Sequence, residues 1–505
     1  MSNPSSYSAI YAFGDSLSDA GNVSIVTALA GRIPVSPPYY EQSYGPLGAL
    51  TATVFSNGPT WVQDLSGLLR LGTLSPSLYG GTDFAYGGAE TGANAGSSFT
   101  GLEISAISLP SQLAQFEASV PTPSSAALYT VSIGTNDLYA ILTTPNLSLP
   151  EMLAQVSAAV SSEASFVSDL IGRGAQNLLV VDAPDLGKMP VVTQGNDPSE
   201  DALASQLSNL YNIDLNASLE TMAQGRGVGL QILPAYSLLD QAAADPSQFG
   251  LTNATDPVWS GNFTDPNSGT LATTDPAQQN QYLFWDHYHP TSSVHALIAA
   301  DAQSLVTTGT PLFPTPTVQM TDTTTGVSST QFGQVYSGPD TGLQGQFVYP
   351  GPDNVVLSAN TPSMYLVGGS GEDAIAALSG SNVLEGGGGS DFLVGATGAD
   401  GGADTFFLDG RGGQTTWDTL LNFHRGDAVT LWGFVSGQST MSWADNEGAA
   451  GYTGATLDVA FAGAGTPVNG SVTFAGISLA DAQSGFSVSS GTVGGIPYLY
   501  VSSNA

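Results

Sequence analysis

The stretch IYAFGDSLSDAGN, residues 10–22, runs from an apolar, strand-like segment into a turn of Gly, Asp and Ser. Two structures would use such residues. One is a plain loop between a strand and a helix, and the other is a strand that carries a nucleophilic serine at its carboxyl end. The tripeptide alone favours the loop, so the rest of the chain has to decide.

The composition narrows the class of protein. The chain of 505 residues has 42 acidic and 7 basic side chains, a net charge of -35, and no cysteine. A basic face for nucleic acid or an anionic membrane is therefore not expected, nor are disulfides, thiolate metal sites or a cysteine nucleophile. We expect no transmembrane helix, because the apolar runs are too short, and no N-terminal signal peptide, because residues 1–10 lack its charged and apolar regions.

Residues 1–310 alternate apolar runs with segments of helical spacing. We expect buried strands at 8–13, 127–133, 177–183 and 228–234, and helices at 149–173, 198–224 and 291–306. This alternation predicts an α/β domain, a parallel sheet covered by helices on both faces. Ligands of such sheets bind beyond the carboxyl ends of the strands, which is where the Gly-Asp-Ser turn falls.

The pattern changes after this domain. Residues 311–349, rich in Thr, Pro, Gly and Ser, are expected to be a linker with a few irregular strands, and 411–505 a β-region of antiparallel strands. Between them, over 350–410, a nine-residue repeat emerges. The segments GGSGEDAIA (368–376) and GGGGSDFLV (386–394) fit the pattern G-G-x-G-x-D-x-U-x, with U apolar, at every fixed position. The apolar position recurs at Leu357, Leu366, Ile375, Leu384 and Leu393.

This repeat predicts a short parallel β-roll, in which Gly-rich turns alternate with strands and each apolar residue points into the core. Asp carboxylates and turn carbonyls offer oxygen ligands for structural Ca²⁺. Because consecutive turns fall on alternate edges, Asp373 should face Asp391 and Asn382 should face Asp400. The candidate calcium ligands are Gly369, Gly371, Asp373, Asn382, Gly387, Gly389, Asp391 and Asp400. The alternative is a glycine-rich β-structure that binds no metal.

The segment 350–430 resembles the RTX (repeats-in-toxin) proteins, through the repeats themselves and through GGADTFFLDG and LLNFHRGDAV after them. The resemblance implies a calcium-binding roll in a bacterial protein that a type I secretion apparatus exports to the extracellular space. It also implies an uncleaved secretion signal near the C-terminus, within 411–505.

A nucleophilic serine needs a base and a carboxylate that orients the base. Three of the four histidines lie in FWDHYHPTSSVH, residues 284–295. Asp286 and His289 stand in D-x-x-H spacing, which on a tight turn lets the carboxylate reach one ring nitrogen while the other faces outward. His295 falls inside the last helix and is expected to be structural or at the surface.

Acyl transfer also needs hydrogen-bond donors for the oxyanion. The stretch DFAYGGAETG, residues 83–92, offers unobstructed backbone N–H groups at Gly87 and Gly88. The stretch SIGTND, residues 132–137, places Asn136 after another expected strand. Either motif alone is ordinary loop sequence, and their value is joint.

Taken together, FGDSLSDAGN, FAYGGAETG, IGTND and FWDHYHPT resemble the sequence blocks of the GDSL lipase/esterase family, the SGNH hydrolases, over about 300 residues. The resemblance implies a flavodoxin-like, three-layer α/β/α hydrolase domain over 1–310. It implies that Ser16 is the nucleophile, that His289 is its general base and that Asp286 orients His289. The implied oxyanion hole consists of the backbone N–H groups of Ser16 and Gly88 and the side chain of Asn136.

The remaining acidic residues of the first motif have a simpler interpretation. Asp15 and Asp19 are expected to be structural, accepting hydrogen bonds from backbone amides around the start of the following helix.

The sequence thus predicts a secreted serine esterase or lipase that forms an acyl-enzyme on Ser16 and needs no cofactor for catalysis. One alternative is a phospholipase or lipid acyltransferase acting on membranes, since relatives with the FWDxxHPT block include such enzymes. An alternative of another class is a non-enzymatic, calcium-dependent adhesin or surface protein. That alternative leaves the Ser, Gly, Asn, Asp and His set unexplained.

Overall fold

The computed structural model describes residues 7–29, 31–36, 38–45, 50–92, 108–265, 267–336, 342–397, 402–412, 415–462 and 468–504. The chain divides into two compact units, Met1–Pro314 and Thr315–Ala505. Of the four segments expected from the sequence, 1–310 falls in the first unit, and 350–410 and 411–505 fall in the second.

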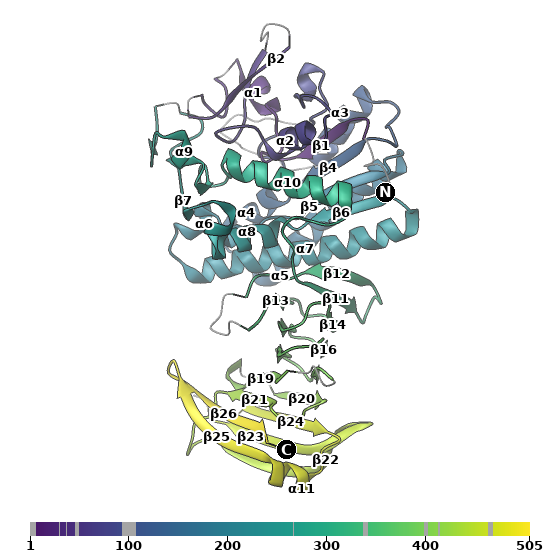
Figure 1. Cartoon of the computed structure of the whole chain (residues 1–505), viewed down its shortest axis with the longest axis vertical. Helices are drawn as coiled ribbons and strands as arrows, with labels where there is room; N and C mark the ends of the chain where they lie inside the picture. The colour runs from purple at the N-terminus through teal and green to yellow at the C-terminus, as the bar shows by residue number, and fades with distance from the viewer. Residues whose placement is uncertain are drawn as a thin grey trace. The chain divides into compact units, whose positions relative to one another are not determined.

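A four-stranded parallel sheet forms the centre of the first unit (Figure 1). Its strands, in spatial order, are β1 (Ile10–Gly14), β4 (Leu128–Ser132), β5 (Asn177–Val181) and β6 (Gly229–Leu233). The segment 82–86 lies along the free side of β1, because Phe84 N donates to Ala12 O at 2.7 Å and Tyr86 N donates to Gly14 O at 3.1 Å. The four apolar runs expected as strands are confirmed.

The helices of this unit follow the strands in the expected alternation. They are α1 (Asn22–Thr27), α2 (Trp61–Leu68), α3 (Leu109–Ser119), α4 (Thr135–Thr143), α5 (Leu149–Gly172), α6 (Pro190–Thr193), α7 (Pro198–Arg226), α8 (Ala235–Ala244), α9 (Pro276–Gln279) and α10 (Ser292–Thr308). Short strands accompany them: β2 (Glu41–Tyr44), β3 (Leu50–Thr53), β7 (Asn253–Pro257), β8 (Trp259–Ser260), β9 (Thr270–Leu271) and β10 (Tyr282–Phe284).

Apolar side chains of the sheet alternate between its two faces, as the period of a strand requires. On one face, Phe13, Val131 and Val180 pack with residues of α3, α5 and α7. On the other, Ile10 and Leu179 pack with residues of α2 and α10. Because both faces are covered, the expected α/β domain is confirmed, and its open edge for ligands is the carboxyl end of the strands.

The second unit is built almost entirely of strands in two sheets, with one short helix, α11 (Leu479–Gly485). The first sheet contains, in spatial order, β12 (Ser328–Phe332), β11 (Thr317–Asp322), β14 (Val355–Ala359), β16 (Ala374–Ala376), β18 (Phe392–Val394), β20 (Thr416–Leu421), β24 (Val468–Ala475), β23 (Tyr452–Phe461) and β22 (Thr440–Ala449). The second contains β13 (Gly345–Val348), β15 (Met364–Val367), β17 (Val383–Glu385), β19 (Thr405–Asp409), β21 (Ala428–Trp432), β26 (Ile496–Ser503) and β25 (Phe486–Val493).

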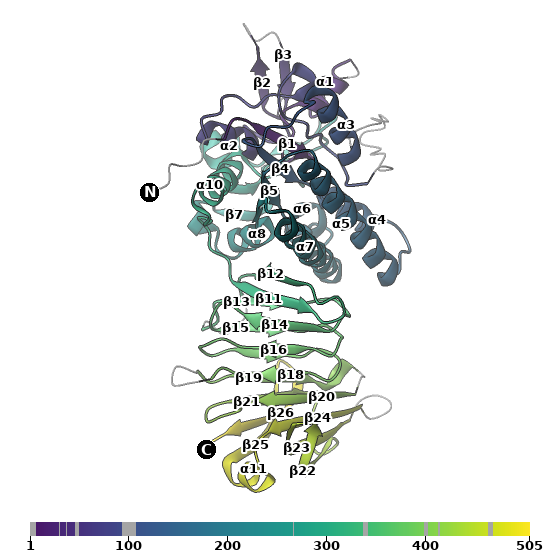
Figure 2. The same cartoon turned by 90° about the vertical axis from the view of Figure 1, so that its right-hand side faces the viewer.

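From β13 to β21, successive strands alternate between the two sheets, and within each sheet they pair in parallel (Figure 2). The chain therefore winds in flat coils, and the side chains on the inner faces meet between the sheets. Leu357, Leu366, Ile375, Leu384 and Leu393 are all fully buried, as the nine-residue apolar register requires.

The register changes after Leu393. At a strict period, Asn382 would face Asp400, and the apolar position would fall on Gly402. Instead, Leu384 pairs with Phe406, and Asn382 N donates to Asp404 Oδ1 at 2.8 Å. The coil before β19 is therefore four residues longer than two repeats, and Asp404 is the residue in register with Asn382, where Asp400 was expected. Asp400 itself lies outside the described residues.

The flanking segments also pair with these sheets. Within 311–349, where a linker with a few irregular strands was expected, β11, β12 and β13 add to the two sheets. Within 411–505, the hairpin β22–β23 and the pairs β23–β24 and β25–β26 are antiparallel, as predicted.

Candidate active site

The turn after β1 is shaped by a glycine that no other residue could replace. Gly14 has a φ of +136°, and a Cβ there would lie 1.9 Å from Ser132 O on the neighbouring strand. The Gln112 side chain, from α3, clamps this peptide, since it accepts from Gly14 N at 2.9 Å and donates to Gly14 O at 2.7 Å. The chain is thus held rigidly up to the residue before Asp15 and Ser16.

The buried carboxyl groups of Asp15 and Asp19 accept hydrogen bonds from backbone N–H groups in and around the turn. Asp15 accepts from Leu17 N at 3.0 Å, and Asp19 accepts from the N–H groups of Gly21 and Gly87 at 2.7 and 2.9 Å. Burial raises the pKa of Asp15 to about 7 and that of Asp19 to about 6, although the amide donors oppose the shift. The structural role expected for Asp15 and Asp19 is confirmed.

Two further residues join this turn to the 83–92 stretch. Asn22 Nδ2 donates to the carbonyls of Asp83 and Ala85 at 2.9 Å each. The Asp83 carboxylate accepts from Ala20 N at 2.6 Å. The first two sequence blocks therefore form one rigid surface at the carboxyl end of β1.

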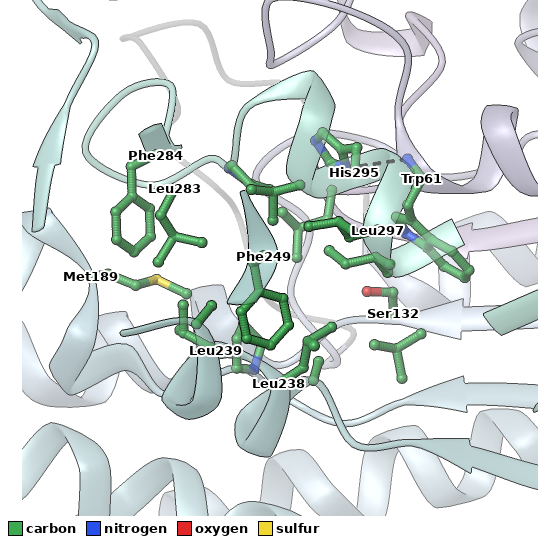
Figure 3. Close-up of a pocket in the computed structure, with 18 of the residues that line it drawn as sticks. Trp61, Ser132, Met189, Leu238, Leu239, Phe249, Leu283, Phe284, His295 and Leu297 are labelled. Carbon is green, nitrogen blue, oxygen red and sulfur yellow. Dashed lines mark hydrogen bonds between the residues drawn. The ribbon is translucent and has the colours of Figure 1, made fainter. Parts of the chain in front are cut away.

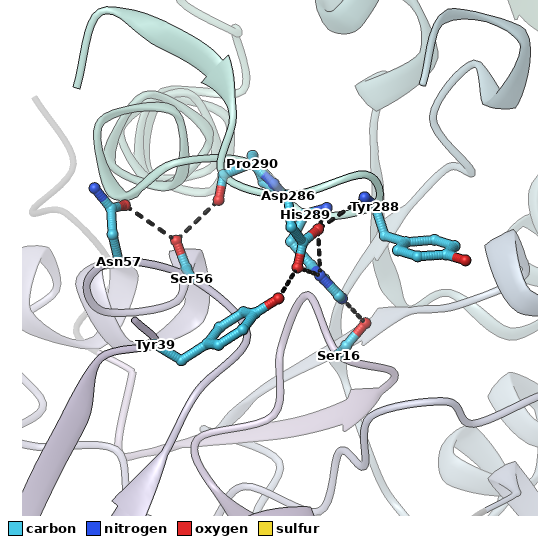
Figure 4. A network of polar contacts seen from close by, with 8 residues as sticks. All are labelled: Ser16, Tyr39, Ser56, Asn57, Asp286, Tyr288, His289 and Pro290. Carbon is cyan, nitrogen blue, oxygen red and sulfur yellow. Dashed lines mark hydrogen bonds and ion pairs between the residues drawn. The ribbon is translucent and has the colours of Figure 1, made fainter. Parts of the chain in front are cut away.

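The predicted serine, histidine and aspartate lie in a line on this surface (Figure 4). His289 Nε2 is 2.8 Å from Ser16 Oγ. His289 Nδ1 is 2.8 and 2.9 Å from the two Asp286 oxygens. Ser16 is half-buried, whereas Asp286 and His289 are buried. This geometry lets a proton leave Ser16 for a ring nitrogen whose other side is fixed by a carboxylate.

Asp286 stays ionised although it is buried. Burial alone would raise its pKa, but the charge of His289 and hydrogen bonds from His289, Tyr39 and the Tyr288 amide hold the pKa of this carboxyl below its usual value. Tyr39 is a residue of the site that sequence reasoning missed. Its hydroxyl donates to Asp286 Oδ2 across 247 positions of sequence, and Tyr39 lies in no motif that would have indicated this contact.

Hydrogen bonds connect the stretches that carry the candidate oxyanion donors. Gly87 N is engaged by Asp19, whereas, among the residues that the structure describes, no hydrogen bond reaches the N–H of Ser16 or of Gly88. Asn136 Nδ2 donates to Ala89 O at 2.9 Å, which ties the third block to the glycine block and leaves its second hydrogen available. Because the N–H of Gly87 is already bonded to Asp19, Gly88 is favoured over Gly87 as the oxyanion donor.

His295 has a structural part. It is 1% exposed, and its Nδ1 accepts from Trp61 N at 3.1 Å, at the start of α2. Burial first, and then the neighbouring His289, lower the pKa of His295 to about 3. A neutral ring is what this acceptor role requires, so the structural interpretation is confirmed.

The first unit contains an apolar cavity (Figure 3). Leu17 and Tyr288, which adjoin Ser16 and His289 in sequence, line it. Its wall continues with Met189, Leu238, Leu239, Phe249, Leu283 and Leu297. Such a wall can hold a hydrocarbon group but offers little to a charged one.

In the second unit, the candidate calcium residues lie on successive coils. A Cβ on Gly387 would be 2.1 Å from Gly369 O, and a Cβ on Gly389 would be 2.1 Å from Gly371 O, so these turns stack. Asp373 N donates to Asp391 Oδ1 at 2.7 Å, which confirms that the two aspartates are neighbours.

Sequence reasoning missed that the row of Asp373 and Asp391 on one edge, and the row of Asn382 on the other, continue into later coils. Phe392 pairs with Thr419, so Asp418 follows Asp391 on one edge. On the other, Asp404 follows Asn382, and Asp427 Oδ1 accepts from Asp404 N at 2.8 Å. Each of these aspartates stands two residues before a buried apolar residue, which is the signal that a search without a fixed period would have used.

Residues 10–302 match the GDSL-like lipase/acylhydrolase family. The match spans more than half of the chain, so the chain belongs to this family and is an enzyme that hydrolyses ester bonds. In the part of the chain that the structure describes, no helix is both long and apolar enough to cross a membrane.

Individual relatives are distant. GDSL esterase/lipase 5 of Arabidopsis thaliana is 25% identical over 312 residues, which cover 57% of this chain and 80% of that protein. The phosphatidylcholine-sterol acyltransferase of Aeromonas hydrophila is 24% identical over 338 residues, 59% of this chain and 90% of that protein. A solved acetylxylan esterase, a catalytic mutant from Geobacillus stearothermophilus, is 16% identical, with a TM-score of 0.29, and covers 61% of this chain and 97% of its own.

Proposed function

We propose that the protein is a serine esterase or lipase that cleaves carboxylic esters through an acyl-enzyme on Ser16. One observation carries the proposal: Ser16 Oγ, the His289 ring and the Asp286 carboxylate are joined by contacts of 2.8–2.9 Å. A family of ester hydrolases supplies the reaction class. The non-enzymatic adhesin alternative gives no reason for these three side chains to meet.

The reaction proceeds in two halves. Ser16 Oγ attacks the ester carbonyl while His289 Nε2 takes its proton, and that proton then passes to the alcohol as the ester C–O bond breaks. Water attacks the acyl-enzyme and gives a proton to His289, which passes it to Ser16 Oγ as the bond between Oγ and the acyl carbon breaks, so the acid leaves and Ser16 is free again. The ionised Asp286 stabilises the imidazolium that forms in each half.

The oxyanion of each tetrahedral intermediate is held by the N–H groups of Ser16 and Gly88 and by Asn136 Nδ2. These donors are fixed before the reaction, because Gly87 is bonded to Asp19 and Asn136 to Ala89. Preorganised donors of this kind cost no rearrangement when charge develops.

The acyl group is expected to be a hydrocarbon chain. The cavity beside Leu17 and Tyr288 is lined mainly by aliphatic and aromatic side chains, and a chain entering it would leave water at about 0.8 kcal/mol per methylene. Acyl transfer to a lipid alcohol, or attack on phospholipids, is the second candidate. The similarity to a phosphatidylcholine-sterol acyltransferase over 90% of that protein favours it.

For the second unit, we propose a structural Ca²⁺ bound at the edge that carries Asp373, Asp391 and Asp418. Within the described residues, Asp391 Oδ2 and Asp418 Oδ1 are buried and have no hydrogen-bond partner. Burial first, and then the charge of Asp373, raise the pKa of Asp391 to about 7. A hard cation would satisfy these oxygens.

Backbone oxygens have to complete such a site. No cluster of three or more His, Cys, Asp or Glu side chains suited to a metal occurs among the described residues. The stacked turns supply carbonyl groups instead, at Gly369 and Gly371, each close to the glycine of the next coil. Export to the extracellular space by a type I apparatus belongs to the same proposal and rests on the RTX-like repeats.

The hydrolase proposal is tested with purified full-length protein and p-nitrophenyl esters from acetate to palmitate, with Ser16→Ala measured beside the parent. Activity in the parent that Ser16→Ala abolishes would support it, and phosphatidylcholine vesicles with and without a sterol acceptor separate hydrolysis from transfer. A folded, calcium-loaded parent that cleaves none of these substrates would refute it.

A further inference from the structure

We infer that Tyr39 is a positioning residue of the reaction, which holds the Asp286 carboxylate in the orientation that serves His289. The inference rests on the proposed function of the serine, histidine and aspartate. It starts from a single contact: the buried Tyr39 hydroxyl donates a hydrogen bond to Asp286 Oδ2 (Figure 4).

The two carboxylate oxygens have different partners. Oδ1 accepts from the backbone N–H groups of Tyr288 and His289, both at 2.8 Å. Oδ2 accepts from Tyr39 and contacts His289 Nδ1 at 2.8 Å. Tyr39 is thus the one donor to Oδ2, among the described residues, that lies outside the 286–289 turn. Without it, the imidazole that the carboxylate is meant to orient would be the one described side chain in contact with this oxygen.

Tyr39 is itself held in place. It is 2% exposed, and its ring packs edge-on against Trp259 at 5.2 Å and Trp285 at 6.3 Å between centroids. Trp285 N in turn donates to His289 O at 2.7 Å. The hydroxyl is therefore presented by a rigid aromatic cluster, so little side-chain freedom is lost when it bonds the carboxylate.

The Tyr39 hydroxyl also occupies a position at which a water molecule would otherwise be the donor to Asp286 Oδ2. Tyr39 and Asp286 both line a cavity of about 290 Å³, whose wall includes Gln194, Asn262 and His287. In the absence of the hydroxyl, water from this cavity would be the available donor to Oδ2. A mobile water holds a carboxylate plane less firmly than a fixed phenol does.

The other charged and titratable groups near Asp286 and His289 do not duplicate the hydrogen bond from the Tyr39 hydroxyl. Among the described residues, Asp286 forms an ion pair with His289 only. Burial first, and then Tyr139 and the charge of Asp286, raise the pKa of Tyr288 on the same turn, and the charge of His289 acts on Asp15 and His295. Apart from His289 Nδ1, none of these groups contacts Oδ2, so removal of the Tyr39 hydroxyl leaves the carboxylate more basic and the His289 imidazolium better stabilised.

The test is Tyr39→Phe in the full-length enzyme, with Tyr129→Phe as the matched control. Tyr129 is equally buried, and its hydroxyl donates to Ser124 O at 2.9 Å, at the opposite end of β4 from the site. Because a hydrogen bond to a charged group is lost, Tyr39→Phe should lower kcat by about 10-fold and leave KM within twofold. The acid limb of the kcat/KM profile should move to higher pH. Tyr129→Phe should change none of these quantities.

A double-mutant cycle separates positioning from general loosening. If Tyr39 acts through Asp286, then Tyr39→Phe should not slow the Asp286→Ala enzyme any further. Equal slowing of the parent and the Asp286→Ala enzyme would overturn the inference, as would a Tyr39→Phe enzyme with unchanged kcat and an unmoved or lowered acid limb. Inactivity of the parent on every ester would refute the proposed function instead.

Discussion

His289 Nε2 lies 2.8 Å from Ser16 Oγ, although 273 positions of sequence separate the two residues. The contact depends on the sheet, since Ser16 follows β1 and His289 belongs to the turn between β10 and α10. Trp285 N bonds His289 O within that turn, so the histidine is held by its own loop as well as by Asp286. The site is therefore assembled from rigid parts before a substrate arrives.

Replacement of Asp286 by Asn should separate orientation from proton transfer. The carboxylate of Asp286 accepts from Nδ1–H of His289, whereas the Asn side-chain NH₂ is a donor and favours a ring with Nδ1 unprotonated. In that tautomer Nε2 carries the proton and cannot accept one from Ser16. The same change in the Ser-His-Asp triad of serine proteases lowers kcat by about 10⁴, and we expect Asp286→Asn to cause a loss of that order. Steady-state kinetics with p-nitrophenyl butyrate and a thermal unfolding curve measure this, and a folded variant with parental kcat would contradict it.

If Asn136 is an oxyanion donor, its removal should lower kcat and leave KM nearly unchanged. Removal of one such donor costs about 10²–10³ in kcat, so Asn136→Ala should fall in that range with KM little changed. Asn177→Ala is the control, because Asn177 also bonds backbone carbonyls, Ser125 O at 2.9 Å, but at the far end of the sheet. Equal effects of the two substitutions on kcat would mean that Asn136 only braces its loop.

How far the sequence could predict the site depended on the length of each signal. Ser16, Gly88, Asn136, Asp286 and His289 sit in short contiguous blocks that follow strands, so both motif and topology pointed to them. Tyr39 has no such block, and its contact exists only because its loop packs against Trp259 and Trp285.

The second unit shows the limit of counting at a fixed period. The nine-residue register placed Leu357 to Leu393 correctly in the core, because each coil there has the same length. Four extra residues before β19 moved the next buried position to Phe406, and a fixed count had no means to detect them.

Calcium should stabilise the second unit most strongly at alkaline pH. Burial raises the pKa of Asp391 to about 7, so the folded state retains a proton that the unfolded state, with a pKa near 3.8, has lost. Without calcium, this contribution to stability is present below about pH 4 and is lost as the pH rises through about 7. Bound Ca²⁺ would offset that loss by pairing with the carboxylate.

Thermal unfolding with calcium and with chelator, at pH 5 and pH 8, measures this effect. The calcium-dependent rise in Tm should be larger at pH 8 and should mostly disappear in Asp391→Asn. The exposed Asp445 provides the control as Asp445→Asn. A calcium response that survives Asp391→Asn unchanged would place the ion elsewhere.

The first unit should also lose stability as the pH rises. Glu163 is fully buried, and burial raises its pKa to about 8 despite the Tyr211 hydroxyl that donates to it. Its contribution to stability is present below the unfolded value of 4.5 and is lost as the pH passes about 8. Glu163→Gln, which is neutral at every pH, should therefore flatten the fall in Tm between pH 5 and pH 9. Glu117→Gln, at a surface pair with Arg173, should not, and a Glu163→Gln curve parallel to the parent would contradict the assignment.

Filling the apolar cavity should shorten the acyl chain that the enzyme prefers. Ala242 is 4% exposed and lines the cavity beside Leu239, so Ala242→Leu would occupy space that an acyl chain needs. The loss of about two buried methylenes, at about 0.8 kcal/mol each, corresponds to a roughly tenfold fall in kcat/KM for p-nitrophenyl octanoate. Acetate hydrolysis, which does not use the cavity, should keep its rate. Ala244→Leu, at an exposed position of the same helix, controls for helix effects. If both esters slow equally in Ala242→Leu, the cavity is part of the core and the acyl chain lies elsewhere.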